Sequence, residues 1–210
     1  MFFSSYVFSF LSIKKYLVMI IGITVSFGSG KTTVAKMFGK LGAYIIDADK
    51  VCHSLMLPSG DVYKRIVRRF GKSVLGKNGA IDRKKMGGLV FEERSKTVAL
   101  NRIVHPHAIK EIKRLIDLNK RKKIIVVDAP LLIESGLYKK MDKLIVVKND
   151  TDRQIYRLAR AKGMDKEEAL KRIRMQEPFR KKAALADFVI DNRGSKKETL
   201  FQVREIWKKL

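Results

Sequence analysis

The chain has 210 residues, 46% of them hydrophobic, so it is long and apolar enough to fold around a core and is not intrinsically disordered. Its single cysteine excludes a disulfide framework and a zinc site made of cysteines alone. The 46 Lys and Arg residues against 21 Asp and Glu give a formal net charge of +25, which favours partners that carry negative charge.

Residues 1–18 are apolar and aromatic but are interrupted by serines and by Lys14 and Lys15. No basic segment precedes the apolar one and no small-residue cleavage site follows it, so it is a poor secretory signal. The stretch is also too short and too interrupted to span a bilayer. We expect an over-extended start outside the fold, with translation beginning at Met19; an amphipathic anchor is the alternative. A cytoplasmic protein without a membrane partner is the resulting expectation.

Residues 18–48 follow the pattern strand, loop, helix, strand. Residues 18–24 form a short continuous apolar run, which is typical of a buried parallel strand. In residues 32–41, Val34, Phe38 and Leu41 share one helical face before a glycine stop signal. Residues 43–48 read as a second strand. This unit predicts a parallel sheet with a right-handed crossover.

The rest of the chain continues as α/β. Amphipathic helical patterns dominate residues 49–119, where no strand-like run of comparable strength occurs. Strands are predicted at residues 123–128, 143–147 and 188–191, a charged helical hairpin at 151–175 with a break near Gly163, and a closing helix at 195–210. We therefore expect one domain over residues 19–210 with a helical insertion at 49–119.

The loop after the first strand fits a phosphate-binding pattern. Residues 25–32 (VSFGSGKT) match G-x-x-x-x-G-K-[ST] except at the first position. Backbone amides there can surround an anion at a helix N-terminus, and glycines allow close approach. Lys31 can reach the β- and γ-phosphates of ATP, and the Thr32 hydroxyl can bind Mg²⁺. The expected nucleotide-binding residues are Phe27, Gly28, Ser29, Gly30, Lys31, Thr32 and Thr33.

Val25 occupies the first position of this pattern, where glycine is expected. A positive φ there would cost a β-branched residue about 1–3 kcal/mol. An extended conformation at a strand end would tolerate it. Both possibilities remain open in the sequence, and we expect a Val25→Gly variant to be neutral or more active.

A dinucleotide-binding fingerprint is the competing interpretation of the same loop. Gly28 and Gly30 would be its first two glycines, with Asp47 or Asp49 as the acid that binds ribose. Thr33 then stands at the third glycine position, and the lysine has no role. The phosphate-loop interpretation is favoured.

Acidic residues follow the second and third strands. The carboxyl ends of parallel strands face the ligand crevice of an open sheet. If the second strand persists, Asp47 and Asp49 share one of its faces. One of them can act as a general base toward a hydroxyl while the other caps the next helix, and the sequence leaves their assignment open. Asp128 follows the third strand, where an acid commonly assists Mg²⁺.

Five motifs in order resemble the dephospho-coenzyme A kinase family, and the resemblance runs from residue 19 to residue 210. They are GITVSFGSGKTTVA at 22–35, LGAYIIDAD at 41–49, IVHP at 103–106, DAPLLIE at 128–134 and ADFVIDN at 186–192. The loop alone is shared by many kinases, whereas the ordered set is specific. The resemblance implies a three-layer phosphate-loop kinase fold with a five-stranded parallel sheet, a coenzyme A-binding insertion at 49–119 and a lid at 151–176.

The resemblance also implies an activity: ATP-dependent phosphorylation of the ribose 3′-hydroxyl of dephospho-coenzyme A. Asp49 matches the family's base, and Lys31 and the lid residue Arg157 would stabilise charge. Asp47, His105 and Asp128 would lie in the substrate site.

The chain departs from the family pattern at three places. Val25 replaces glycine, and Lys148 replaces an acid that is frequent after the fourth strand. The family lid often reads RxxxRDG, whereas here Arg157 is followed by Arg160 and then by Ala-Lys-Gly, so the second lid arginine is shifted by one.

Two other functions remain as alternatives. One is a related kinase acting on a nucleoside or nucleotide, against which the long insertion after IDAD counts. The other is a basic nucleic-acid-binding protein with a degenerate loop, supported by the net charge. Because no nucleic-acid-binding motif is present, we expect no stable nucleic-acid partner.

Overall fold

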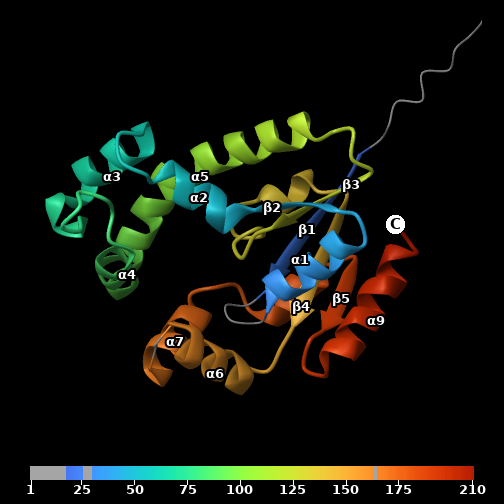
Figure 1. Ribbon diagram of the computed structural model, residues 1–210. Coiled ribbons are helices and arrows are strands. Elements are labelled where there is room, and N and C mark those ends of the chain that lie inside the picture. Colours follow the sequence, from blue (N-terminus) through green and yellow to red (C-terminus); the bar gives the residue numbers. More distant parts are fainter. Residues whose placement is uncertain (1–17, 26–29, 163–164) are drawn as a thin grey trace, which may run out of the picture.

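The computed structural model describes residues 18–25, 30–162 and 165–210 (Figure 1). In these residues five strands form one sheet in the order β2-β3-β1-β4-β5, and every neighbouring pair is parallel. The strands are β1 (Met19–Val25), β2 (Tyr44–Asp47), β3 (Ile124–Asp128), β4 (Lys143–Lys148) and β5 (Phe188–Asp191). Each predicted strand is confirmed to within one residue at each end. The predicted parallel α/β fold is therefore confirmed.

The helices account for most of the remaining described chain. They are α1 (Lys31–Lys40), α2 (Ala48–Leu55), α3 (Asp61–Phe70), α4 (Arg83–Glu92), α5 (Arg94–Leu118), α6 (Thr151–Lys162), α7 (Lys166–Arg174), α8 (Phe179–Ala184) and α9 (Lys196–Trp207), with 3₁₀ turns η1 (Lys72–Val74) and η2 (Leu137–Lys140). The sequence patterns did not resolve α2 or α8 as separate helices. None of the described helices combines the length and the apolar character needed to cross a membrane.

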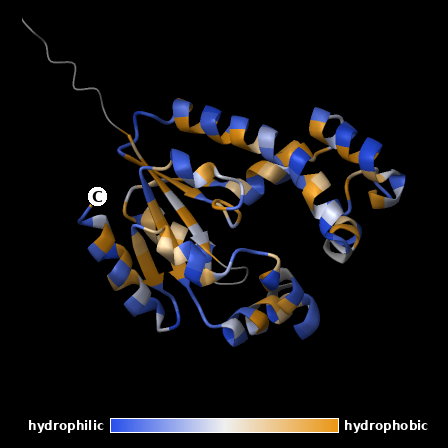
Figure 2. Ribbon diagram, turned by 180° about the vertical axis from the view of Figure 1, so that it is seen from behind, coloured by the Kyte–Doolittle hydropathy of each residue, from blue (hydrophilic) through white to orange (hydrophobic). Residues whose placement is uncertain are grey.

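Helices cover both faces of the sheet, which gives three layers (Figures 1 and 2). Alternate strand residues point to opposite faces, so Val126 packs with α1 and α9 whereas Ile125 and Val127 pack with α2 and α5. Phe38 of α1 and Ile112 of α5 are fully or nearly fully buried on these two faces. Burial on both sides explains why the strands read as continuous apolar runs.

Gly22 lies in the middle of β1, where the chain comes closest to the segment after β3. A Cβ atom at this position would overlap the side chain of Leu132 and lie 2.9 Å from Cγ of Met141. The small residue therefore lets the turn after β3 pack directly on the central strand, next to the candidate site.

Helices α3 and α4, at the left of Figure 1, stand apart from the sheet and form an apolar cluster with part of α5. Its buried members come from α3, α4, α5 and η1 and are Val62, Ile66, Val74, Met86, Val90 and Val104. The 25-residue helix α5 connects this cluster with the sheet, because Ala108 and Ile112 farther along it pack beneath β3. Thus α5 determines where the helical segment stands relative to the strand ends.

Candidate active site

The carboxyl ends of β1, β2 and β3 meet at one edge of the sheet. Asp47 and Asp128 are direct partners in the β2–β3 pairing, and Asp128 pairs with Ile23 of β1 on its other side. Strand β1 lies between β3 and β4: β2 and β3 are placed on one side of it, and the connection from β3 to β4 crosses to the other side. Ligands of open α/β sheets bind in the crevice at such a switch point.

Helix α1 begins at this edge with an open N-terminus. Its N-cap residue, Gly30, has φ 85° and ψ 24°, a left-handed conformation that favours glycine. No side chain caps the helix and no acidic residue lies in its first turn, where Thr32 and Thr33 are exposed. The first amides of a helix have no acceptors within it, so this end is suited to an anion. Phe27, Gly28 and Ser29 lie outside the described residues.

Val25 is the last residue of β1 and has the extended backbone of a strand. Of the two possibilities that the sequence left open, a positive φ and an extended conformation, the structure shows the second. Val25 pairs with Val147 of β4 and is only 2% exposed within the core. Among described non-glycine residues, Ser59 is the one with a positive φ. The valine is therefore compatible with the backbone at this position, and its side chain contributes to the core.

Lys31 is buried directly behind the helix N-terminus. Its Nζ lies 2.6 Å from Oδ1 of Asp128 and 3.8 Å from Oδ2 of Asp49. The sequence predicts that this lysine reaches phosphate. In the structure its ammonium forms ion pairs with two of the three predicted carboxylates. A positive charge is thus held at the place where the strand ends and the helix N-terminus meet.

Burial raises the pKa of Asp128 above its ordinary value, because desolvation disfavours the carboxylate. The ammonium of Lys31 opposes this shift, and the charges of Asp47 and Asp49 add to it. The carboxylates of Asp47 and Asp49 thus act on Asp128 together with a single ammonium, and an additional positive charge would be favourable there.

The two aspartates after β2 have different environments. The strand ends at Asp47, so the hypothesis that Asp47 and Asp49 share a strand face is wrong. Asp47 is the N-cap of α2, and its Oδ1 accepts a hydrogen bond of 3.0 Å from the amide of Lys50. Asp49 lies in the first turn of α2 with its side chain 68% exposed. Asp47 is thus engaged in capping, whereas Asp49 presents a carboxylate to solvent.

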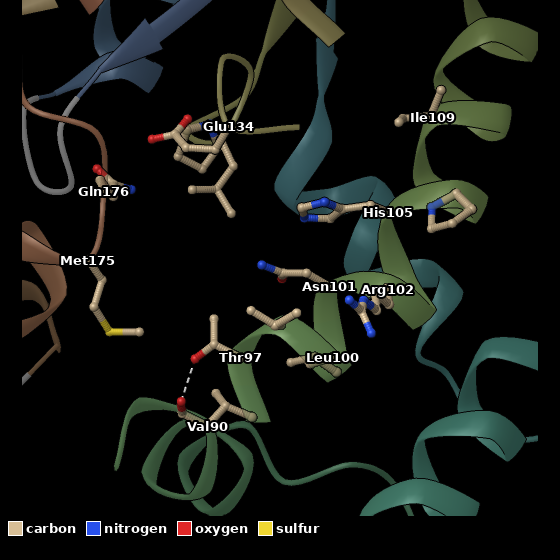
Figure 3. Close-up of a pocket in the computed structure, with 14 residues that line it drawn as sticks. Val90, Thr97, Leu100, Asn101, Arg102, His105, Ile109, Glu134, Met175 and Gln176 are labelled. Atoms are coloured by element: carbon tan, nitrogen blue, oxygen red, sulfur yellow. Dashed lines mark hydrogen bonds between the residues drawn. The ribbon is translucent and has the colours of Figure 1, made fainter. Parts of the chain in front are cut away.

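A cavity of about 820 Å³ opens between α5 and the turn after β3 (Figure 3). Residues of α5 form one wall, the turn after β3 forms a second, and Met175 and Gln176 form a third. The lining is largely apolar, with a few polar side chains: Thr97, Asn101, Arg102, His105, Glu134 and Gln176. Large apolar cavities with a few polar groups are typical of small-molecule sites.

His105 lies inside α5. Burial lowers its pKa, and the nearby charge of Glu134 opposes that shift. The next residue, Pro106, has no N–H, so the carbonyl of Arg102 one turn earlier has no helical donor. Arg102, His105 and Pro106 all line the cavity, which therefore has a cation and an imidazole along one wall.

A second cavity, of about 70 Å³, shares His105 with the large cavity and is also lined by Asp49, which contacts Lys31. Asp49 and Cys52 of α2 line it together with His105 of α5. Burial, followed by the charges of Asp49 and Asp47, raises the pKa of Cys52 to about 11. Cys52 is therefore a neutral thiol at pH 7, whereas Asp49 contacts Lys31 and also lines the small cavity that it shares with His105.

Oxygen ligands for Mg²⁺ are present beside the helix N-terminus. Thr32, Asp47 and Asp128 line a common pocket of about 490 Å³. In the described part of the chain, no three His, Cys, Asp or Glu side chains are arranged to hold a metal ion. Mg²⁺ usually takes one or two protein oxygens together with water and phosphate oxygens, which fits this set.

The remaining predicted site residue is Arg157. It belongs to α6, which packs side by side with α7 through the buried residues Leu158 and Ala169. The side chain of Arg157 lies outside the described part of the chain.

Lys182 was missed by the sequence analysis. Its side chain is fully buried on α8, and its Nζ contacts Glu134, the carbonyl of Val25 and the carbonyl of Pro130. No sequence signal separates it from the other lysines and arginines, since its burial depends on segments more than 45 residues away in the chain.

The strand order and the helix N-terminus that opens after β1 define the class: the protein has the α/β fold of phosphate-loop kinases. The family model described as dephospho-CoA kinase matches residues 19–198. The chain therefore belongs to the dephospho-CoA kinase family, as the ordered motifs indicated.

Individual relatives agree with this assignment. The chain is 40% identical to the dephospho-CoA kinase of Aquifex aeolicus over 190 residues, which cover 90% of this chain and 96% of that protein. A crystal structure of a Thermus thermophilus protein superposes with a TM-score of 0.76 at 27% identity, covering 92% of this chain and 98% of that one. The dephospho-CoA kinase from Campylobacter jejuni superposes with a TM-score of 0.65 at 27% identity, covering 90% and 96%.

Proposed function

We propose that this protein transfers the γ-phosphoryl group of ATP to the ribose 3′-hydroxyl of dephospho-coenzyme A, the last step of coenzyme A synthesis, in the cytoplasm. One observation carries the proposal: Asp49 lies 3.8 Å from Lys31 and shares a cavity with His105, which also lines the larger cavity. A phosphate site and an acceptor site thus meet at one exposed carboxylate. We propose no nucleic-acid or membrane partner for this reaction.

The donor would bind at the N-terminus of α1. Amides and hydroxyls of Gly30, Thr32 and Thr33 support this placement, with Phe27, Gly28 and Ser29 proposed as the rest of the loop. Lys31 would exchange its contact with Asp128 for a phosphate oxygen and stabilise the charge of the transferred group. The Thr32 hydroxyl and the Asp128 carboxylate would hold Mg²⁺, which when bound neutralises phosphate charge.

The acceptor would bind in the cavity of about 820 Å³. Dephospho-coenzyme A combines a long, largely apolar arm with a diphosphate and an adenosine, which suits apolar walls with a few polar groups. The guanidinium of Arg102 would face the diphosphate, and the neutral imidazole of His105 would hydrogen-bond the ribose end.

Asp49 would act as the general base. Its carboxylate is free of the capping role that Asp47 performs, and it is exposed toward both sites. It would accept the proton of the 3′-hydroxyl as that oxygen attacks phosphorus. Arg157, on the segment 151–176 that we propose as a lid, would add a second positive charge to the transferring group.

The direct test is to incubate purified protein with Mg-ATP and a panel of acceptor alcohols. We expect ADP release that depends on dephospho-coenzyme A, with a product whose mass has increased by one phosphoryl group. Turnover with nucleosides or nucleotides but not with dephospho-coenzyme A would contradict the proposal.

An Asp49→Asn variant separates the base from a binding role. We expect kcat to fall by a factor of about 100 or more, because proton transfer by a positioned group contributes about that much. The affinity for Mg-ATP, measured by titration, should stay within about threefold of wild type. Asp117→Asn, an exposed change on α5, is the matched control. Equal losses in kcat and in nucleotide affinity would instead assign Asp49 to metal binding or folding.

A further inference from the structure

Lys182 is a lysine in the interior of the protein. Its side chain is 0% exposed, and its Nζ lies 2.8 Å from Oε1 of Glu134. The same nitrogen donates hydrogen bonds of 3.2 Å to the carbonyl of Val25 and of 3.3 Å to the carbonyl of Pro130. Burying an ammonium costs several kcal/mol unless it is paired and fully hydrogen-bonded. Three oxygen partners match the three N–H groups of a lysine.

The three oxygens belong to different parts of the site. Val25 is the last residue of β1, immediately before the phosphate loop. Pro130 follows Asp128 by two residues, and its carbonyl also accepts a hydrogen bond of 3.1 Å from Thr24. Glu134 lines the large cavity beside His105 (Figure 3). One ammonium therefore connects the donor side of the site with the wall of the acceptor side.

Glu134 extends this connection to the segment after α7. Its Oε1, besides contacting Lys182, accepts a hydrogen bond of 3.1 Å from the amide of Glu177. The preceding residues Met175 and Gln176 line the cavity. The pair of Glu134 and Lys182 thus holds the turn after β3 against the segment after α7, and these two segments form two walls of the cavity. The same pair is attached to the end of β1 through the carbonyl of Val25.

No substrate can touch an ammonium that is fully enclosed by protein, so Lys182 cannot be a catalytic residue. We infer that Lys182 is a positioning residue: its ammonium fixes the carbonyls of Val25 and Pro130 and the carboxylate of Glu134, and so aligns the phosphate loop with the acceptor cavity. This inference rests on the proposed function. A misplacement of about 1 Å between reacting groups can lower a rate by about a hundredfold.

The test uses four variants. Lys182→Met removes the charge but keeps the volume, and Glu134→Gln neutralises the partner. The double variant Lys182→Met/Glu134→Gln has no unpaired buried charge, so it carries the test even if Lys182→Met does not fold. Lys181→Met is the matched control, because Lys181 is the adjacent residue of α8, is 73% exposed and pairs with Glu177 at the surface.

We expect the double variant to recover most of the melting temperature lost by Lys182→Met. Its kcat per folded protein should nevertheless stay about a hundredfold below that of Glu134→Gln, because the two carbonyls remain unheld. Lys181→Met should have the kcat of wild type. A double variant whose kcat lies within about tenfold of the Glu134→Gln value would overturn the inference, since Lys182 would then be only one half of a structural ion pair.

The outcome also distinguishes this inference from the proposed function. If the wild-type protein does not phosphorylate dephospho-coenzyme A, the proposed function fails and the Mg-ATP titration decides the role of Lys182. An affinity at least about tenfold weaker in the double variant than in Lys181→Met would support positioning of the loop. Equal affinities would overturn it.

Discussion

Lys31 and Asp128 form a buried ion pair in which each charge compensates the desolvation cost of the other. Removing one partner of such a pair leaves an uncompensated charge and costs about 3–5 kcal/mol. Since the pKa of Asp128 is already raised by burial, the loss of Lys31 would raise it further. Lys31 therefore has a role in stability as well as the proposed role in binding phosphate.

A Lys31→Met variant should show this role through its pH dependence. An acid whose pKa is higher in the folded than in the unfolded state destabilises the fold as pH rises between the two values. The deficit in melting temperature relative to wild type should be larger at about pH 8 than at about pH 5, where Asp128 is closer to protonation. Lys36→Met, an exposed change on the same helix, should show no such trend. An equal deficit at both pH values would contradict the expectation.

Val25 has a role that the loop pattern did not indicate. Its buried side chain packs in the core with Val147 as its strand partner. The expectation that Val25→Gly is neutral or more active concerns activity. For stability we expect a loss of about 2–4 kcal/mol in the free energy of unfolding, because a cavity forms and glycine weakens the strand. Urea denaturation would measure it, and an unchanged midpoint would show that the neighbouring side chains fill the space.

At the scale of single elements, the close approach between β1 and the turn after β3 leaves no room for an added methyl group. A Gly22→Ala variant would place its methyl group against Leu132 and should cost about 1–3 kcal/mol. Gly88 of α4 offers the same substitution, and outside its own helix backbone and its chain neighbours no described atom lies within 4 Å of the new Cβ, so Gly88→Ala should be neutral or slightly stabilising. Similar melting temperatures for the two variants would contradict the close approach.

The strands and the long helices could be predicted because each has a periodic or continuous apolar pattern. Helix α8 has only six residues, FRKKAA, which is too short for a helical period to be recognised. Helix α2 follows β2 without a break, and its start depends on the Asp47 cap. Such elements are specified by packing and capping, which a hydropathy pattern does not contain.

Several residues of the candidate site could also be predicted from the sequence. Lys31, Asp49 and Asp128 stand beside recognisable strand ends, and the structure brings both carboxylates into contact with the lysine. The cavity could not be predicted, because its walls come from α5, the turn after β3 and the segment after α7. Lys182 could not be predicted either, because a fully buried lysine has the same local sequence character as an exposed one.

For the whole molecule, a net charge of +25 should accelerate the capture of anionic substrates. We expect the KM for dephospho-coenzyme A to rise several-fold when KCl is increased from about 50 to about 300 mM, because salt screens this attraction. The value of kcat at saturation should change less than about twofold. Sucrose at equal osmolality is the control, and a KM independent of salt would show that the charge does not act on the substrate.

The apolar cluster of α3, α4 and η1 has one further consequence. Its main neighbours are α5 and α2 rather than the strands. Subglobal opening can therefore release α3 and α4 while the sheet stays closed, and their amide protons should exchange with deuterium sooner than those of β1, β3 and β4. A fold arranged in this way can exchange one set of helices for another during evolution without rebuilding its centre.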